Sequence, residues 1–150
     1  MTTRVASALY VTFQASGPRR TVRAEGRLPR LEGRRVLLVE DELLIALDLQ
    51  LSIEDEGADV ALADGVRTGL AAIAEHQASD RLPDVALLDV RLGDGEVFPI
   101  ADLLAEMGVP IVFHSGHAQS EDLAAAYPGA AVLSKPAPID RLVTALAERL

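Results

Sequence analysis

The chain has 150 residues, of which 49% are hydrophobic, and this composition is typical of one folded domain with a substantial core. It has no cysteine, which excludes disulfides, thiolate metal sites and cysteine nucleophiles, and which is compatible with a cytoplasmic location. No apolar stretch approaches the length of a membrane span, so we expect no membrane association.

The net charge of −9 is divided unevenly along the chain. Eight of the 14 basic residues lie before Val36, where only Glu25 and Glu32 are acidic. Residues 1–33 lack sustained periodicity and are rich in Arg, Ser, Thr, Gly and Pro, which predicts a disordered basic arm, locally extended over residues 9–13. A transit peptide, a nucleic-acid-binding arm and a start codon assigned too far upstream are alternative interpretations. The acidic remainder argues against direct binding of nucleic acid.

From residue 34 onward, five short apolar stretches alternate with five helical patterns. In the first helix, Leu44, Leu47 and Leu51 form an apolar stripe that we expect to face the core. The alternation predicts an α/β fold, (βα)5, with a doubly wound parallel five-stranded sheet and helices on both faces. The expected strands cover residues 36–39, 58–62, 85–89, 109–114 and 130–133, and the expected helices cover residues 42–56, 66–77, 96–107, 120–127 and 139–149.

Four of the five expected strands end in a reactive polar group. These groups are Glu40 with Asp41, Asp89, Ser115 and Lys135, which is the only lysine of the chain. The carboxyl ends of parallel strands share one edge of the sheet, so we expect these side chains to lie together. Clustered carboxylates favour a hard divalent cation such as Mg²⁺, and a neutralised carboxylate can accept a phosphoryl group as an acyl phosphate. An isolated lysine ammonium suits a contact with phosphate oxygens.

These motifs resemble the CheY-like receiver domains of two-component response regulators. The resemblance covers residues 35–150 and rests on Val39-Glu40-Asp41, Leu88-Asp89, Pro110 followed by Ser115-Gly116, and Lys135-Pro136, in this order and at compatible spacing. It implies a response regulator receiver domain over residues 34–150, with the flavodoxin-like strand order 2-1-3-4-5.

The resemblance also assigns roles to individual residues. Asp89 corresponds to the phosphoacceptor, and Lys135 corresponds to the cation that contacts the phosphoryl oxygens. The resemblance also implies that the Lys135-Pro136 peptide bond is cis. Ser115 corresponds to the switch hydroxyl. The implied Mg²⁺ ligands are Asp89, Asp41, Glu40 acting through water, and the backbone carbonyl of Arg91.

Three departures from the family pattern affect the expected switch. Val132 stands where the family usually has an aromatic residue, and the turn over residues 92–95 is shorter and lacks the usual proline. Residues 113–117 are similar to the Phe-Ala-Thr-Gly-Tyr signature of certain single-domain receivers, in which the segment after the hydroxyl carries the signal. His117 in this segment tunes the access of water to the acyl phosphate or is a bystander.

The resemblance implies a stand-alone receiver that is not an enzyme acting on other substrates but catalyses its own phosphotransfer and autodephosphorylation. Its expected partners are a histidine kinase or histidine phosphotransfer protein, a downstream protein target, and a second copy of the chain in a homodimer. A phosphorylation-independent interaction module and an aspartyl-phosphate hydrolase are the alternatives. The haloacid dehalogenase-like hydrolases have a second Asp where Arg91 stands here. Asp94 is expected to be a turn residue, and Glu40 alone could simply flank a helix start.

Overall fold

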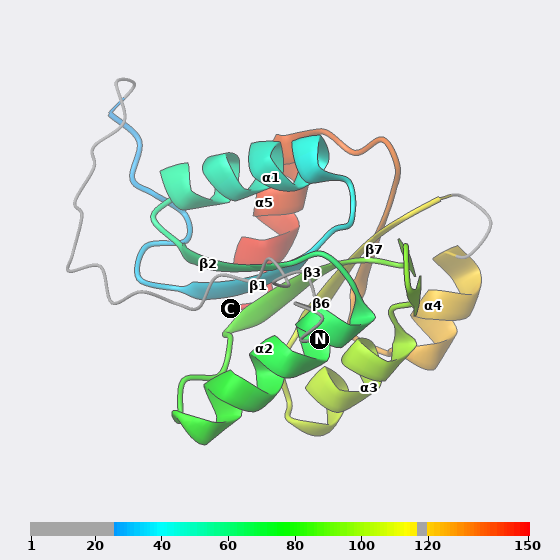
Figure 1. Ribbon diagram of the computed structural model, residues 1–150. Helices are drawn as coiled ribbons and strands as arrows, with labels where there is room; N and C mark the ends of the chain where they lie inside the picture. Colours follow the sequence, from blue (N-terminus) through cyan, green and yellow to red (C-terminus); the bar gives the residue numbers. More distant parts are fainter. Residues whose placement is uncertain (1–25, 117–119) are drawn as a thin grey trace.

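A five-stranded parallel sheet forms the centre of the computed structural model, which describes residues 26–116 and 120–150 (Figure 1). The order β2-β1-β3-β6-β7 is the predicted order 2-1-3-4-5 when the strands of the sheet alone are counted. The apolar β3 is buried along its whole length at the middle of the sheet. The strands are β1 (Arg35–Val39), β2 (Asp59–Ala63), β3 (Val85–Asp89), β6 (Ile111–Ser115) and β7 (Ala131–Ser134).

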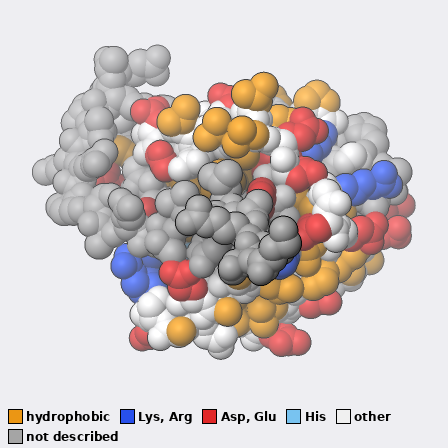
Figure 2. Space-filling view, viewed as in Figure 1, with side chains coloured by type: hydrophobic (Ala, Val, Ile, Leu, Met, Phe, Trp, Pro, Cys, Tyr) orange, Lys and Arg blue, Asp and Glu red, His pale blue; other side chains and the backbone are white. Residues whose placement is uncertain are grey.

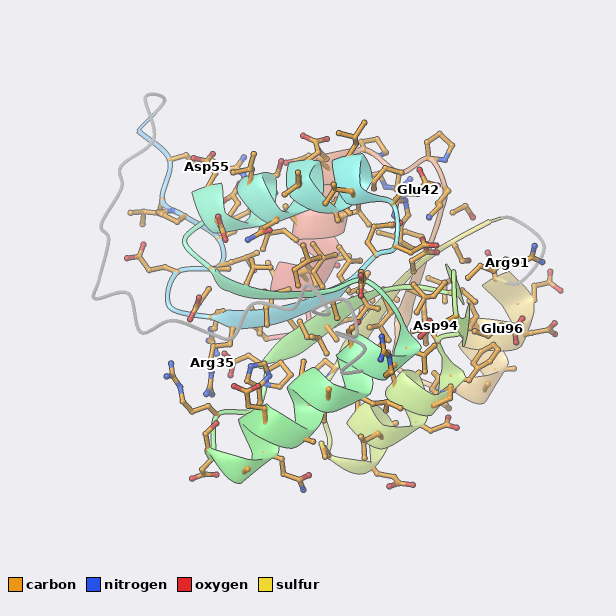
Figure 3. All side chains as sticks on the ribbon, viewed as in Figure 1. Arg35, Glu42, Asp55, Arg91, Asp94 and Glu96 are labelled. Atoms are coloured by element: carbon orange, nitrogen blue, oxygen red, sulfur yellow. The ribbon has the colours of Figure 1, made fainter. Side chains whose placement is uncertain are left out.

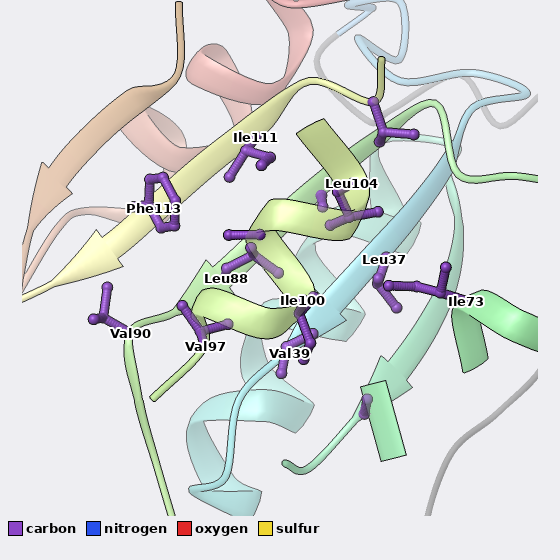
Figure 4. Packing of buried hydrophobic residues seen from close by; sticks show 14 of the residues in the cluster. Leu37, Val39, Ile73, Leu88, Val90, Val97, Ile100, Leu104, Ile111 and Phe113 are labelled. Atoms are coloured by element: carbon purple, nitrogen blue, oxygen red, sulfur yellow. The ribbon is translucent and has the colours of Figure 1, made fainter. Parts of the chain in front are cut away.

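Helices cover both faces of the sheet, as the alternation predicts (Figure 1). One face carries α1 (Leu43–Asp55) and α5 (Ile139–Ala147), and the other carries α2 (Val66–Ala78), α3 (Phe98–Glu106) and α4 (Ser120–Ala126). Two clusters of buried side chains therefore lie on opposite faces of the sheet. Figure 4 shows the first, in which Leu88, Ile100, Leu104 and Phe113 pack between the strands and the α2–α3 layer. Within the described part of the chain, no helix has the length and apolar character required to cross a membrane.

A small antiparallel hairpin follows β3, where we expected only a turn. Its strands β4 (Arg91–Leu92) and β5 (Gly95–Glu96) pair Arg91 with Glu96 and Leu92 with Gly95. Gly95 has a φ of 142°, a conformation that side-chain-bearing residues rarely adopt. The hairpin leads directly into α3, whose first turn accommodates Pro99.

The predicted core face of α1 is wrong. Ala46, Leu49 and Ile53 are the buried residues of this helix, whereas Leu44 is 82% exposed and Leu51 is 66% exposed. The sequence of α1 has apolar residues all around the helix, so two stripes at helical spacing compete for the sheet. The stripe that begins with the small Ala46 is the one that packs on the sheet.

The described end of the expected arm is also not disordered. Leu31 is fully buried with the α1 and α5 side chains, and its N–H donates to the carbonyl of Glu56 at 2.9 Å. The guanidinium of Arg30 donates to the Glu56 carboxylate at 2.8 Å. The folded part therefore includes residues 29–33, which tie the start of β1 to the end of α1. The rest of the predicted arm, residues 1–25, lies outside the described residues.

Candidate functional site at the carboxyl edge of the sheet

The structure brings Glu40, Asp41, Asp89 and Lys135 together at the carboxyl edge of the sheet. Asp89 is the last residue of β3, Glu40 follows the neighbouring β1, and Lys135 follows β7. Glu40 and Asp89 are 2% and 7% exposed, although both can carry a charge. Burial of two acids side by side is costly unless a cation compensates for it.

Lys135 supplies part of that compensation. Its Nζ lies 3.2 Å from Oδ2 of Asp89 and 3.6 Å from Oε2 of Glu40. Burial alone would lower the pKa of Lys135, but the carboxylates of Asp89 and Glu40 outweigh it and raise that pKa. The lysine therefore stays charged and links the ends of β1, β3 and β7.

The single positive charge of Lys135 lies beside two carboxylates, those of Asp89 and Glu40. Burial, together with the nearby charge of Asp89, raises the pKa of Glu40 to about 7, although Oε1 of Glu40 accepts a hydrogen bond from the N–H of Glu42 at 3.1 Å. Burial is the main cause of this shift, and the nearby carboxylate of Asp89 adds to it, so the pocket disfavours the charged form of Glu40.

The three acids fit a divalent cation. One carboxylate oxygen from each of Glu40, Asp41 and Asp89 lies within 4.8 Å of the others, and Asp41 is exposed while the other two are buried. Oxygen donors with one open side are what Mg²⁺ requires, because it retains several waters.

Ser115 and Arg91 lie next to this cluster, and the backbone carbonyl of Ser115 accepts a hydrogen bond from the N–H of Lys135 at 2.7 Å. Ser115 ends β6 and is 1% exposed, and its hydroxyl donates to the carbonyl of Gly116 at 3.2 Å. Arg91 begins the hairpin two residues after Asp89, with its side chain exposed (Figure 3). A Cβ added at Gly93 would lie 3.7 Å from the Asp41 carboxylate, so the hairpin borders the acids. The role of the Arg91 carbonyl stays a prediction, and His117 lies outside the described residues.

Asp94 does more than turn the chain. Its carboxylate oxygens accept hydrogen bonds from the N–H groups of Val66 at 2.7 Å and Arg67 at 3.1 Å, at the start of α2 (Figure 3). These two bonds lower the pKa of Asp94. The residue that precedes α2 is Gly65, which has no side chain to cap the helix, so the hairpin provides the cap from 27 and 28 residues away.

Sequence reasoning missed His114, which is opposite Asp89 in the sheet register. Its ring is buried, and Nε2 accepts a hydrogen bond from the N–H of Ala137 at 3.4 Å, just after the cis Lys135-Pro136 bond. Burial and the nearby Lys135 lower the pKa of His114, which favours the neutral ring. Its position next to Ser115 on an expected strand was the available signal. The cis Lys135-Pro136 bond itself confirms the expectation.

Comparison with known proteins agrees with this geometry. The model of the response regulator receiver domain family matches residues 36–147. The chain is 36% identical over 110 residues to the KDP operon transcriptional regulatory protein KdpE of Escherichia coli, an alignment that covers 71% of this chain and 47% of KdpE. The chain therefore spans about half the length of that relative.

Solved structures give the same result. A response regulator receiver protein from Sinorhizobium medicae superposes with a TM-score of 0.67 at 28% identity, over 79% of this chain and 95% of the other. A CheY-like receiver domain protein from Methanospirillum hungatei gives a TM-score of 0.66 at 26% identity, over 77% and 92% of the two chains. The chain belongs to the response regulator receiver domain family of two-component systems.

Proposed function

We propose that Asp89 accepts a phosphoryl group from the phosphohistidine of a histidine kinase or a histidine phosphotransfer protein. The observation that carries this proposal is the pair of contacts from Lys135 Nζ to Asp89 and Glu40, at the same edge as the exposed Asp41. A buried acceptor carboxylate, a fixed cation and a set of oxygen donors are what phosphoryl transfer to a carboxylate requires.

Each residue of the site has its own role in the proposed phosphoryl transfer. One carboxylate oxygen of Asp89 attacks phosphorus as the phosphorus–nitrogen bond to the donor imidazole breaks, and the imidazole leaves with the bonding pair. Lys135 is 3.2 Å from the acceptor carboxylate, so its ammonium can pair with a phosphoryl oxygen. Glu40, Asp41, Asp89 and the Arg91 carbonyl would hold Mg²⁺, which supplies neutralisation of the phosphoryl charge when bound.

The signal then leaves through Ser115 and the segment that follows it. We propose that the hydroxyl turns from the Gly116 carbonyl toward the phosphoryl group on Asp89. The partially exposed Val132 on β7 offers no aromatic ring to follow this motion. The proposed output is therefore a contact between the segment after Ser115 and a cytoplasmic protein target, or transfer of the phosphoryl group to another histidine.

The test is phosphorylation by a small phosphodonor, followed by intact mass. Wild-type chain, incubated with the donor and Mg²⁺, should gain the mass of one phosphoryl group, and the gain should be labile to base and absent with a chelator. Asp89→Ala should show no gain. Asp64→Ala is a matched control, because it removes an exposed aspartate just after β2, and it should be modified like wild type.

The variant Lys135→Arg tests whether the shape of the cation at this position matters in addition to its charge. The planar guanidinium keeps the positive charge but not the compact point charge, so we expect slower modification with the same final mass. Absence of any gain, with the small donor and with a panel of phosphorylated histidine kinases, would contradict the phosphoacceptor proposal. That result would favour the phosphorylation-independent interaction module.

A further inference from the structure

An exposed apolar surface runs along α1, on the side turned away from the sheet. It consists of Leu43, Leu44, Leu47 and Leu51, which are 59%, 82%, 42% and 66% exposed, and we call it the α1 leucine face. At helical spacing these four residues lie within an arc of about 100°. Figure 2 shows hydrophobic side chains gathered along the top of the molecule, where Figure 1 places α1. A cluster of large exposed apolar side chains on one helix marks a contact surface.

The acidic residues of α1 indicate which kind of segment would bind to this face. The helix contains Asp48, Glu54 and Asp55 and no basic residue. A second copy of the chain would bring two acidic helices together, which is unfavourable. A segment with apolar and basic side chains would cover the leucines and pair with the acids.

The chain itself supplies such a segment. Residues 1–24 contain four arginines and no acid, and Leu9, Val11 and Phe13 alternate with Tyr10 and Thr12, a pattern that places three apolar side chains on one side of an extended segment.

The point of attachment brings this segment within reach. Residues 29–32 lie against the C-terminal end of α1, where a Cβ added at Gly57 would be 2.9 Å from Cα of Glu32. Arg30 pairs with Glu56 at the same end. The thirteen Cα-to-Cα steps from Phe13 to Gly26 span up to about 43 Å when extended, whereas α1 is about 20 Å long. The segment can therefore turn back along the whole leucine face.

We propose that residues 9–13 dock on the α1 leucine face of the same molecule, with the arginines of the arm beside the acids of α1. The face is then covered in the free protein, and any protein that binds α1 has to displace the arm. This inference goes beyond the phosphorylation of Asp89 and does not depend on it.

The absence of native cysteine allows a direct test in the full chain. Phe13→Cys is combined with Leu47→Cys on the leucine face or, as the control, with Ala74→Cys, which is exposed on α2 across the sheet. At low protein concentration, docking should make the intramolecular disulfide of the first pair form about tenfold faster than that of the control, because docking adds to the effective concentration that tethering provides. Gels without reductant and intact mass follow the reaction.

Each outcome decides the proposal. Adding Leu44→Asp and Leu51→Asp to the first pair should slow its disulfide to the control rate. Equal rates for the two original pairs would overturn docking in cis, and disulfide-linked dimers through Leu47→Cys would assign the face to a second copy. Phosphorylation of Asp89 in every variant, measured by mass, shows that the domain is folded and keeps the failure of docking separate from failure of the proposed function.

Discussion

Glu40 is a buried acid whose charge depends on what surrounds it. Its pKa is raised from 4.5 to about 7, mainly by burial and then by Asp89. Between these two values, the unfolded chain has released a proton that the folded chain still holds. In the absence of a divalent cation, this residue therefore makes the free energy of unfolding fall as the pH rises from 4.5 to about 7.

We expect Glu40→Gln to remove that contribution. The variant should gain stability relative to wild type when the pH is raised from about 5 to about 8, since only wild type has the Glu40 proton to lose in this range. Urea unfolding in the presence of a chelator measures the difference. Glu42→Gln, which is exposed, serves as the control, and an unchanged difference between Glu40→Gln and wild type at the two pH values would show that Glu40 ionises normally.

At the residue scale, sequence reasoning succeeded where a side chain's place depends only on its strand. Asp89 ends one short apolar stretch that predicts a strand and Lys135 follows another, and parallel strands carry their ends to one edge. Asp94 shows the limit. Its partners are the N–H groups of Val66 and Arg67 in the first turn of α2, and no local pattern connects that helix to the hairpin.

At the scale of elements, the hairpin after β3 holds the first turn of α2. Asp94→Ala should remove the cap and lower the free energy of unfolding by about 1 kcal/mol. Asp94→Asn keeps a side-chain acceptor and should lose less. Glu96→Ala, on the same hairpin but outside the two bonds that Asp94 accepts from α2, is the control, and equal losses at Asp94 and Glu96 would contradict the capping role. Chemical denaturation gives all three values.

The helix α1 shows how periodicity can misjudge the core face of an element. Its leucines and its buried stripe of Ala46, Leu49 and Ile53 are both at helical spacing, so hydrophobicity alone prefers the larger side chains. The sheet instead takes the stripe with the smaller Ala46. In α3, by contrast, the large apolar side chains of Ile100 and Leu104 are themselves buried.

At the scale of the whole molecule, residues 29–33 fasten two helices to the domain. Arg30 contacts Glu56 after α1 and Asp140 in α5, at 2.8 and 2.9 Å, while Leu31 fills the core between these helices. The alternation of strands and helices predicted the layers of the fold correctly. The sequence predicted disorder for this segment, because a single buried leucine in irregular structure has no period and the surrounding composition is polar and basic.

Leu31→Ala should therefore be costly. Removing a fully buried leucine lowers the free energy of unfolding by about 3 kcal/mol, through lost transfer energy and the cavity left behind. Leu28→Ala, three residues earlier and 73% exposed, should change it little. Thermal and urea unfolding of the two variants makes the comparison. A small loss at Leu31 would show that the segment is not part of the folded core.

The single lysine of the chain has a practical consequence for chemistry in solution. Reagents that acylate amines find one side-chain target, and that target is the ammonium between Asp89 and Glu40. Amine-directed labelling therefore works as a footprint of this site. For the same reason, coupling the protein to a surface through Lys135 would modify the ammonium that links the ends of β1, β3 and β7.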